Sequence, residues 1–140
     1  ALGSTGHTVM KVNQGFWQIE TAGWSVDQSE DCITLCPADA DAALQLSCAR
    51  KRAADVSQDE LLQFASTHLS KHAVQPVSAA FGDFRGYGAE FVDGDSSWRQ
   101  WWLAAGRTHL FITFNTHIDH QALHKEVVDW ILSSLTALDG

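Results

Sequence analysis

Residues 98–114, WRQWWLAAGRTHLFITF, decide the fold, because they form two apolar runs on either side of a Gly106-Arg107 pair. A glycine followed by one further residue is typical of a two-residue turn between antiparallel strands. Such a turn pairs Ala105 with Thr108 and fixes the register of everything before and after it. The stretch therefore predicts a β-hairpin, and the rest of the fold can be built outward from it.

A second turn of the same kind, at Gly94-Asp95, extends the pairing to the preceding strand. The combined register sets Glu90 opposite Arg99, an opposite-charge pair that supports it. Side chains on successive residues alternate between the two faces of the sheet. One face is then aliphatic and includes Trp101. The other face carries five aromatic residues, Tyr87, Phe91, Trp98, Trp102 and Phe111.

A sheet with two apolar faces must cover both of them or use one for binding. Two interpretations stay open at this point. In the first, two helices cover opposite faces and the aromatic residues are part of the core. In the second, the aromatic face stays partly open and binds a protein partner. Both depend on the turns being two residues long, because a slip of one residue would exchange the faces.

The other elements follow from turn residues and periodicity. Residues 57–60, SQDE, have the capping-box pattern, and apolar residues then recur at helical spacing to about His72. The remaining elements are expected as two strands within 15–26 around Gly23, strands at 32–36, 42–51, 76–82, 85–92, 96–105 and 108–115, and a last helix from about residue 117 or 120 to 138. This order predicts an α+β fold, an antiparallel sheet of hairpins and a four-strand meander packed with two main helices.

Three segments carry a resemblance to a known family: GFWQIETAGWSV (15–26), ALQLSCARKRAADVSQDELLQFASTHL (43–69) and WRQWWLAAGRTHLFITF (98–114). From Phe16 onward the chain resembles the PsbP/DcrB-like small domains, which include the Ran-interacting Mog-type proteins. The resemblance implies a sheet packed against helices that serves as a binding or assembly scaffold, with no shared catalytic motif. One branch, the effector-associated chaperones of type VI secretion, holds apolar helices of a client protein, and other members are lipoproteins or photosystem subunits.

The charge and the length of the chain exclude some functional classes and indicate the number of domains. The 140 residues carry a formal net charge of −8, with nine Lys and Arg and no basic stripe, which excludes a nucleic-acid binder. No apolar run is long enough to span a membrane. We expect one domain over 10–140, with residues 1–9 an appended remnant or a disordered arm.

Three cysteines, Cys32, Cys36 and Cys48, form no zinc or redox spacing, and free thiols favour a cytoplasmic location. A trimmed export signal would make the periplasm the alternative.

The stretch THIDHQALHKEVVDW (116–130) raises the question of a metal site. On a helix, its three histidines His117, His120 and His124 would all lie on the packing side. Residues 117 and 124 would be about 10 Å apart along the axis, too far for one zinc ion to bind all three. We therefore expect structural histidines, with Thr116 or Asp119 capping the helix. A second pair, His68 and His72, lies on the apolar side of the first helix.

No nucleophile elbow, phosphate loop or dinucleotide fingerprint occurs, so the sequence favours neither an enzyme nor a cofactor. It predicts a non-catalytic domain that binds a protein partner through the aromatic face. An adaptor, a client chaperone and an immunity-type protein fit equally, and a homodimer is a further form of partnership. The alternatives are a metal-binding protein that uses the three histidines of 116–130, and an exported lipoprotein-like domain.

Overall fold

The computed structural model describes residues 11–13, 16–29, 32–38 and 41–138. Its largest part is a seven-stranded antiparallel sheet in the order β3-β4-β5-β9-β8-β7-β6, and a smaller sheet has the order β1-β2-β10. The elements are β1 (Lys11–Asn13), β2 (Trp17–Glu20), β3 (Ser25–Gln28), β4 (Cys32–Cys36), β5 (Ala42–Arg50), α1 (Gln58–Leu69), η1 (Ser70–His72), β6 (Val77–Phe81), β7 (Phe84–Asp93), β8 (Ser96–Ala105), β9 (Thr108–His117), η2 (Ile118–His120), α2 (Lys125–Ser133) and β10 (Thr136–Ala137). The predicted α+β class with an antiparallel sheet is confirmed.

The meander has the predicted register. Only two residues separate β7 from β8 and β8 from β9, and both turn glycines, Gly94 and Gly106, have positive φ. Trp102 pairs with Phe111 on β9 and with Tyr87 on β7. The division of the sheet into an aliphatic and an aromatic face is therefore confirmed.

The predicted last helix is wrong in its extent. Strand β9 continues to His117, which pairs with Ser96, and η2 then turns the chain before α2 begins at Lys125. The helix ends at Ser133, and β10 follows because residues 136–137 pair with β2. Thr116 is thus a strand residue and caps no helix. Similarly, the two strands predicted within 15–26 are present but belong to different sheets.

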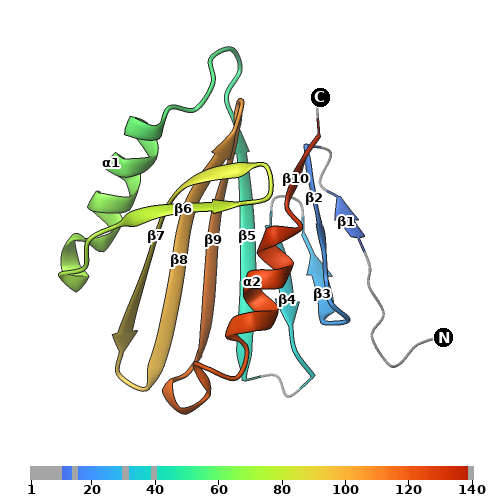
Figure 1. Ribbon diagram of the computed structural model, residues 1–140, viewed down its shortest axis with the longest axis vertical. Coiled ribbons are helices and arrows are strands. Elements are labelled where there is room, and N and C mark those ends of the chain that lie inside the picture. Colours follow the sequence, from blue (N-terminus) through green and yellow to red (C-terminus); the bar gives the residue numbers. More distant parts are fainter. Residues whose placement is uncertain (1–10, 14–15, 30–31, 39–40, 139–140) are drawn as a thin grey trace.

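The two helices lie on opposite faces of the large sheet. On the aliphatic face, α2 and the small sheet cover a core that includes Trp17, Leu44, Trp101, Ile112 and Ile131. Figure 1 shows α2 across the strands β4 and β5, with β2 and β10 beside it and α1 at the opposite side near β7. On the aromatic face, α1 contributes its own smaller cluster. Each face therefore has a helix, as the first interpretation requires.

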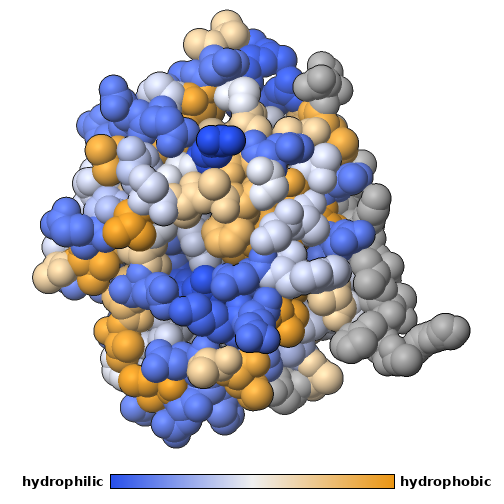
Figure 2. Space-filling model, in the orientation of Figure 1, coloured by the Kyte–Doolittle hydropathy of each residue, from blue (hydrophilic) through white to orange (hydrophobic). Residues whose placement is uncertain are grey.

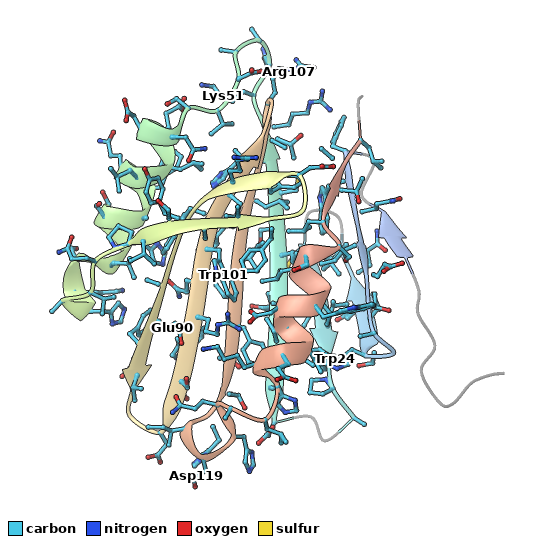
Figure 3. All side chains as sticks on the ribbon, viewed as in Figure 1. Trp24, Lys51, Glu90, Trp101, Arg107 and Asp119 are labelled. Carbon is cyan, nitrogen blue, oxygen red and sulfur yellow. The ribbon has the colours of Figure 1, made fainter. Side chains whose placement is uncertain are left out.

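A long hairpin closes the aliphatic face. Strand β6 and the start of β7 cross in front of β8 and β9, and the tip of the hairpin lies beside α2 and β10 (Figure 1). The backbone N–H of Asp83 donates to the Leu135 carbonyl at 3.1 Å, and the Asp83 carboxylate accepts from the Ala137 N–H at 2.9 Å. Beneath the hairpin, Phe81 packs edge-on against Trp101, which Figure 3 shows near the middle of the sheet. This face is closed.

Candidate binding groove

Helix α1 covers only part of the aromatic face. Its capping box is as predicted, since Ser57 Oγ accepts from the Glu60 N–H and Glu60 accepts from the Ser57 N–H, both at 3.1 Å. The helix buries Leu61, Ala65 and Leu69 against β7 and β8. A helix of 12 residues is about 18 Å long, and its apolar stripe covers two strands of a sheet that has seven. The face beyond β8 is left to other side chains.

The five predicted binding residues divide into two groups. Trp102 is 3% exposed and packs under α1 in one cluster with Tyr87, which is half-buried. Phe91, Trp98 and Phe111 are half-buried and line the space beside the helix. Phe91 and Phe111 also pack against this cluster, so each of them contributes both to the support of α1 and to the open surface.

Histidines complete this surface. His68 lies 5.3 Å from Phe111 and 5.7 Å from Trp102, measured between ring centroids. His72 stacks on Phe91 at 4.0 Å with 18° between the ring planes. The sequence pattern placed His68 and His72 on the apolar side of the first helix. It did not predict that they would contact the aromatic face.

One further ring pair extends the surface towards the other end of α1. Phe64 stacks on His109 at 5.5 Å, and Phe64 is 48% exposed. Alternation along β9 places His109 on the aromatic face, two residues from Phe111. We call the whole surface the aromatic groove, formed by Phe64, His68, His72, Phe91, Trp98, Trp102, His109 and Phe111.

The groove has two lobes that share His68. The Phe64 lobe is about 740 Å³ and is lined by Glu60, Gln63, Phe64, Thr67, His68, Trp102, His109 and Phe111. The Gln100 lobe is about 480 Å³ and is lined by His68, Lys71, His72, Phe91, Val92, Asp93, Trp98 and Gln100. Both volumes fall in the range of sites that bind small ligands or protruding side chains.

Two buried polar atoms of the groove have no hydrogen-bond partner among the described residues. They are Oε1 of Gln100, in a residue only 7% exposed, and Nε2 of His109. A buried acceptor without a partner costs about 1–3 kcal/mol, and a ligand that supplies a donor recovers this. Burial also lowers the pKa of His109, which the nearby Glu60 carboxylate partly opposes. Burial therefore favours the neutral form of the imidazole.

Charge at the rim of the groove is mixed. Glu60 accepts a hydrogen bond from Lys51 at 2.9 Å, and this contact, with the Ser57 backbone, lowers the pKa of the Glu60 carboxyl. At the Gln100 lobe the rim carries the exposed charged residues Lys71 and Asp93. Beyond β9 the same face is polar, with Gln45 and Thr34 in contact on β5 and β4. The groove is thus an aromatic strip between α1 and a polar half of the sheet.

Figure 2 views the opposite side of the molecule. Figure 2 shows its apolar residues, among those drawn in colour, as separate patches between polar side chains. Trp130 of α2 is 47% exposed there. It provides an exposed tryptophan away from the groove.

The three histidines of the 116–130 stretch do not share a helix. His117 ends β9, His120 ends η2, and His124 is the residue before α2. His120 Nδ1 contacts the carboxylate of Asp41, and His124 Nε2 lies 3.9 Å from the other Asp41 oxygen.

These contacts tie the segment after β9 to the start of β5. His124 also packs on the Trp24 ring, which lies at the lower end of α2 in Figure 3. Within the part of the chain that the structure describes, no three His, Cys, Asp or Glu side chains are placed to hold a metal ion.

The three cysteines are free thiols in the structure. Cys32 and Cys36 project from the polar half of the aromatic face, and Cys48 packs against the aliphatic core. None of the helices among the described residues has the length and apolar character needed to cross a bilayer.

Comparisons with known proteins concern the fold. No protein-family model and no curated protein matches the chain. Among solved structures, a protein of Bacteroides thetaiotaomicron VPI-5482 is similar at 12% identity with a TM-score of 0.69; the match covers 96% of this chain and 50% of that one. The present chain thus spans half the length of that protein. This likeness shows a shared fold.

Two further structures are similar at lower scores. Cyanobacterial PsbP (CyanoP) of Synechocystis sp. PCC 6803 has 11% identity and a TM-score of 0.48, with 96% of this chain and 94% of that one covered. LpqN of Mycobacterium tuberculosis, involved in cell envelope biogenesis, has 13% identity and a TM-score of 0.45, covering 94% and 84%. These scores are too low to carry an argument. Neither a DcrB protein nor a type VI chaperone is among the three, and none of them supports a cytoplasmic location.

Proposed function

We propose that this chain is a non-catalytic binding domain that takes a segment of a protein partner into the aromatic groove. The observation that carries the proposal is the incomplete cover of the aromatic face by α1. It leaves Phe64, Phe91, Trp98 and Phe111 in contact with solvent beside Gln100, whose Oε1 has no hydrogen-bond partner in the described part of the chain. Aromatic residues with nearby unsatisfied polar groups are typical of interface centres.

The partner is expected to be basic around an apolar anchor. The chain has a net charge of −8, and an acidic protein attracts cationic partners while it repels acidic ones. An adaptor, a client chaperone and an immunity-type protein would all use the groove in this way. The identity of the captured partner distinguishes them, and a second copy of the chain would make the groove a homodimer interface.

Cellular location is a separate prediction. The free cysteines favour the cytoplasm, and export to the periplasm is the alternative. Fractionation of the host, with an antibody against this chain, distinguishes the two.

The test is capture of a partner from the host, with variants that separate the groove from the rest of the surface. Trp98→Ala combined with Phe111→Ala removes rings from both lobes. Trp130→Ala is the matched control, because it removes a half-exposed tryptophan on the other side of the molecule. We expect one protein to be enriched by the wild type and by Trp130→Ala, and to be lost with the double variant.

Stability must be measured in parallel. Trp102→Ala is unsuitable as a binding variant, since truncating a buried tryptophan costs about 3–5 kcal/mol. The double variant should unfold at a lower urea concentration than the wild type, because Phe111 packs against the cluster under α1, but it should remain folded without urea. A partner retained equally by the folded double variant would contradict the proposed function.

A further inference from the structure

The Gln100 lobe has the features of a site for one particular side chain. Its floor is the buried Gln100, whose Oε1 has no hydrogen-bond partner among the described residues. An amide oxygen accepts hydrogen bonds and donates none, so only a donor can satisfy it. An occupant that carries N–H or O–H groups would therefore satisfy it.

The walls of the lobe restrict the shape of the occupant. Phe91 and Trp98 lie on adjacent strands with ring planes 12° apart and centroids 6.4 Å apart, and His72 stacks on Phe91. His72 covers one face of Phe91, so the ring surface left to an occupant is mainly that of Trp98. The face of an aromatic ring carries partial negative charge. A flat cation fits such a surface better than a tetrahedral or anionic group.

The negative charge of the chain also favours a cationic occupant. The whole chain is acidic by eight units, and Asp93 is on the rim of this lobe. Lys71, which is exposed, is a positive charge on the same rim. Among protein side chains, a planar cation with several N–H donors is the guanidinium of arginine, which stacks on aromatic rings and donates in a fixed geometry.

We propose that the Gln100 lobe binds an arginine side chain of the partner. The guanidinium packs on the Trp98 ring beside the His72–Phe91 stack and donates to Gln100 Oε1, with Asp93 as the nearby counter-charge. The inference rests on the proposed function and deepens it. In this arrangement the Phe64 lobe binds the apolar part of the partner, and the Gln100 lobe binds its positively charged side chain.

The test uses a blocked tripeptide, acetyl-Gly-Arg-Gly-amide, beside the same peptide with lysine or with citrulline. Citrulline keeps the planar shape and N–H groups of arginine but has no charge. Binding is followed by NMR on the side-chain amide of Gln100 and the indole N–H of Trp98. We expect the arginine peptide to shift both signals, and the other two to bind at least about tenfold more weakly.

Two variants of the whole chain sharpen the result. Gln100→Leu replaces the amide with an apolar side chain of similar size. The acceptor is lost, and arginine binding should weaken by about tenfold or more. Lys71→Gln removes the like charge at the rim and should strengthen it by about two- to fivefold. An anionic or sugar ligand would instead lose affinity with Lys71→Gln.

Equal binding of citrulline and arginine, or unchanged binding by Gln100→Leu, would overturn the inference. The proposed function is tested separately by partner capture with the Trp98→Ala, Phe111→Ala variant. If capture depends on those rings while the arginine peptide fails to bind, the groove is an interface without an arginine site. If the peptide binds but the double variant captures the partner as well as the wild type does, the proposed function is wrong. The conclusion that the bound arginine belongs to a protein partner is then wrong too.

Discussion

At the scale of single residues, His109 shows how position changes the chemistry of a side chain. It lies on the aromatic face between Phe64 and the strand β5, where Ala49 is its neighbour. Burial lowers the pKa of His109, and the Glu60 carboxylate only partly compensates. The folded protein therefore takes up a proton at this site less readily than the unfolded chain does.

This difference predicts a pH dependence of stability. The pKa of an unfolded histidine is about 6.5, so below that pH the unfolded chain binds a proton that folded His109 resists. Stability should thus be complete above this range and fall as the pH decreases through it. We expect His109→Gln to lose less unfolding free energy than the wild type between about pH 7.5 and about pH 5.5. Urea titrations at several pH values measure this, and equal slopes for both proteins would contradict it.

Cys48 is the second residue whose chemistry is set by packing. It lies against the aliphatic core, and burial raises the pKa of its thiol, although Trp17 and Arg50 lower it in part. The thiolate is the nucleophilic form of cysteine. Cys48 should therefore be the least reactive of the three thiols in the folded protein.

Alkylation at neutral pH tests this directly. Iodoacetamide should modify Cys48 more slowly than Cys32 and Cys36, as measured by mass spectrometry of the peptides over time. In urea, where burial is removed, the three rates should become similar. A native rate for Cys48 as fast as that of Cys32 would show that its side chain is not protected by the core.

At the scale of elements, the hairpin of β6 and β7 depends on the glycine at its tip. Gly82 has φ of +57°, a region that other residues enter with strain, and a Cβ here would collide with the backbone oxygen of Leu135. The missing side chain lets the tip approach the end of α2, where Asp83 makes its two backbone contacts.

Two glycine substitutions separate strain from collision. Gly94→Ala should cost about 1 kcal/mol, because Gly94 has a similar φ of +61° but no atom within 4 Å of the added Cβ. Gly82→Ala should cost about 1–3 kcal/mol more, because the hairpin must also move away from Leu135. Urea unfolding of both variants measures the difference, and equal losses would mean that the tip is not held against α2.

At the scale of the whole molecule, the beginning and the end of the described chain are joined. Strand β2 pairs with β10, and the backbone N–H of Leu138 donates to the Phe16 carbonyl at 2.8 Å. Arg99 of β8 forms an ion pair of 2.7 Å with Asp129 of α2. The small sheet, α2 and the large sheet therefore share one core, and none of them can open without exposing the others.

This arrangement predicts a single cooperative unfolding transition, as is usual for one domain of this size. Far-ultraviolet circular dichroism reports the sheet, and tryptophan fluorescence reports both faces, since Trp101 and Trp102 lie on opposite ones. The two urea curves should coincide. Separate midpoints would indicate that the α1 layer or the small sheet unfolds on its own.

Turns, strand register and the start of the first helix could be predicted from residues that are close together in the chain. The turns at Gly94 and Gly106, the register of β7, β8 and β9, and the start of α1 were predictable. A turn or a cap depends on residues within a few positions of one another, and the twofold alternation of a strand then extends the register without further information. The two faces of the meander, including the five aromatic residues, followed from this alone.

Which elements cover each face of the large sheet depends on contacts between distant segments and could not be predicted from the sequence. The pattern of 116–130 has helical spacing, but pairing with β8 extends β9 to His117, and pairing of 136–137 with β2 ends the last helix early. Likewise, the sequence could not show that α1 packs against only part of β7 and β8. The groove lies where this cover ends, beside β9 and at the ends of β7 and β8 near Gly94. These outcomes depend on contacts between distant segments, whose combined burial outweighs the weaker local preferences of the chain.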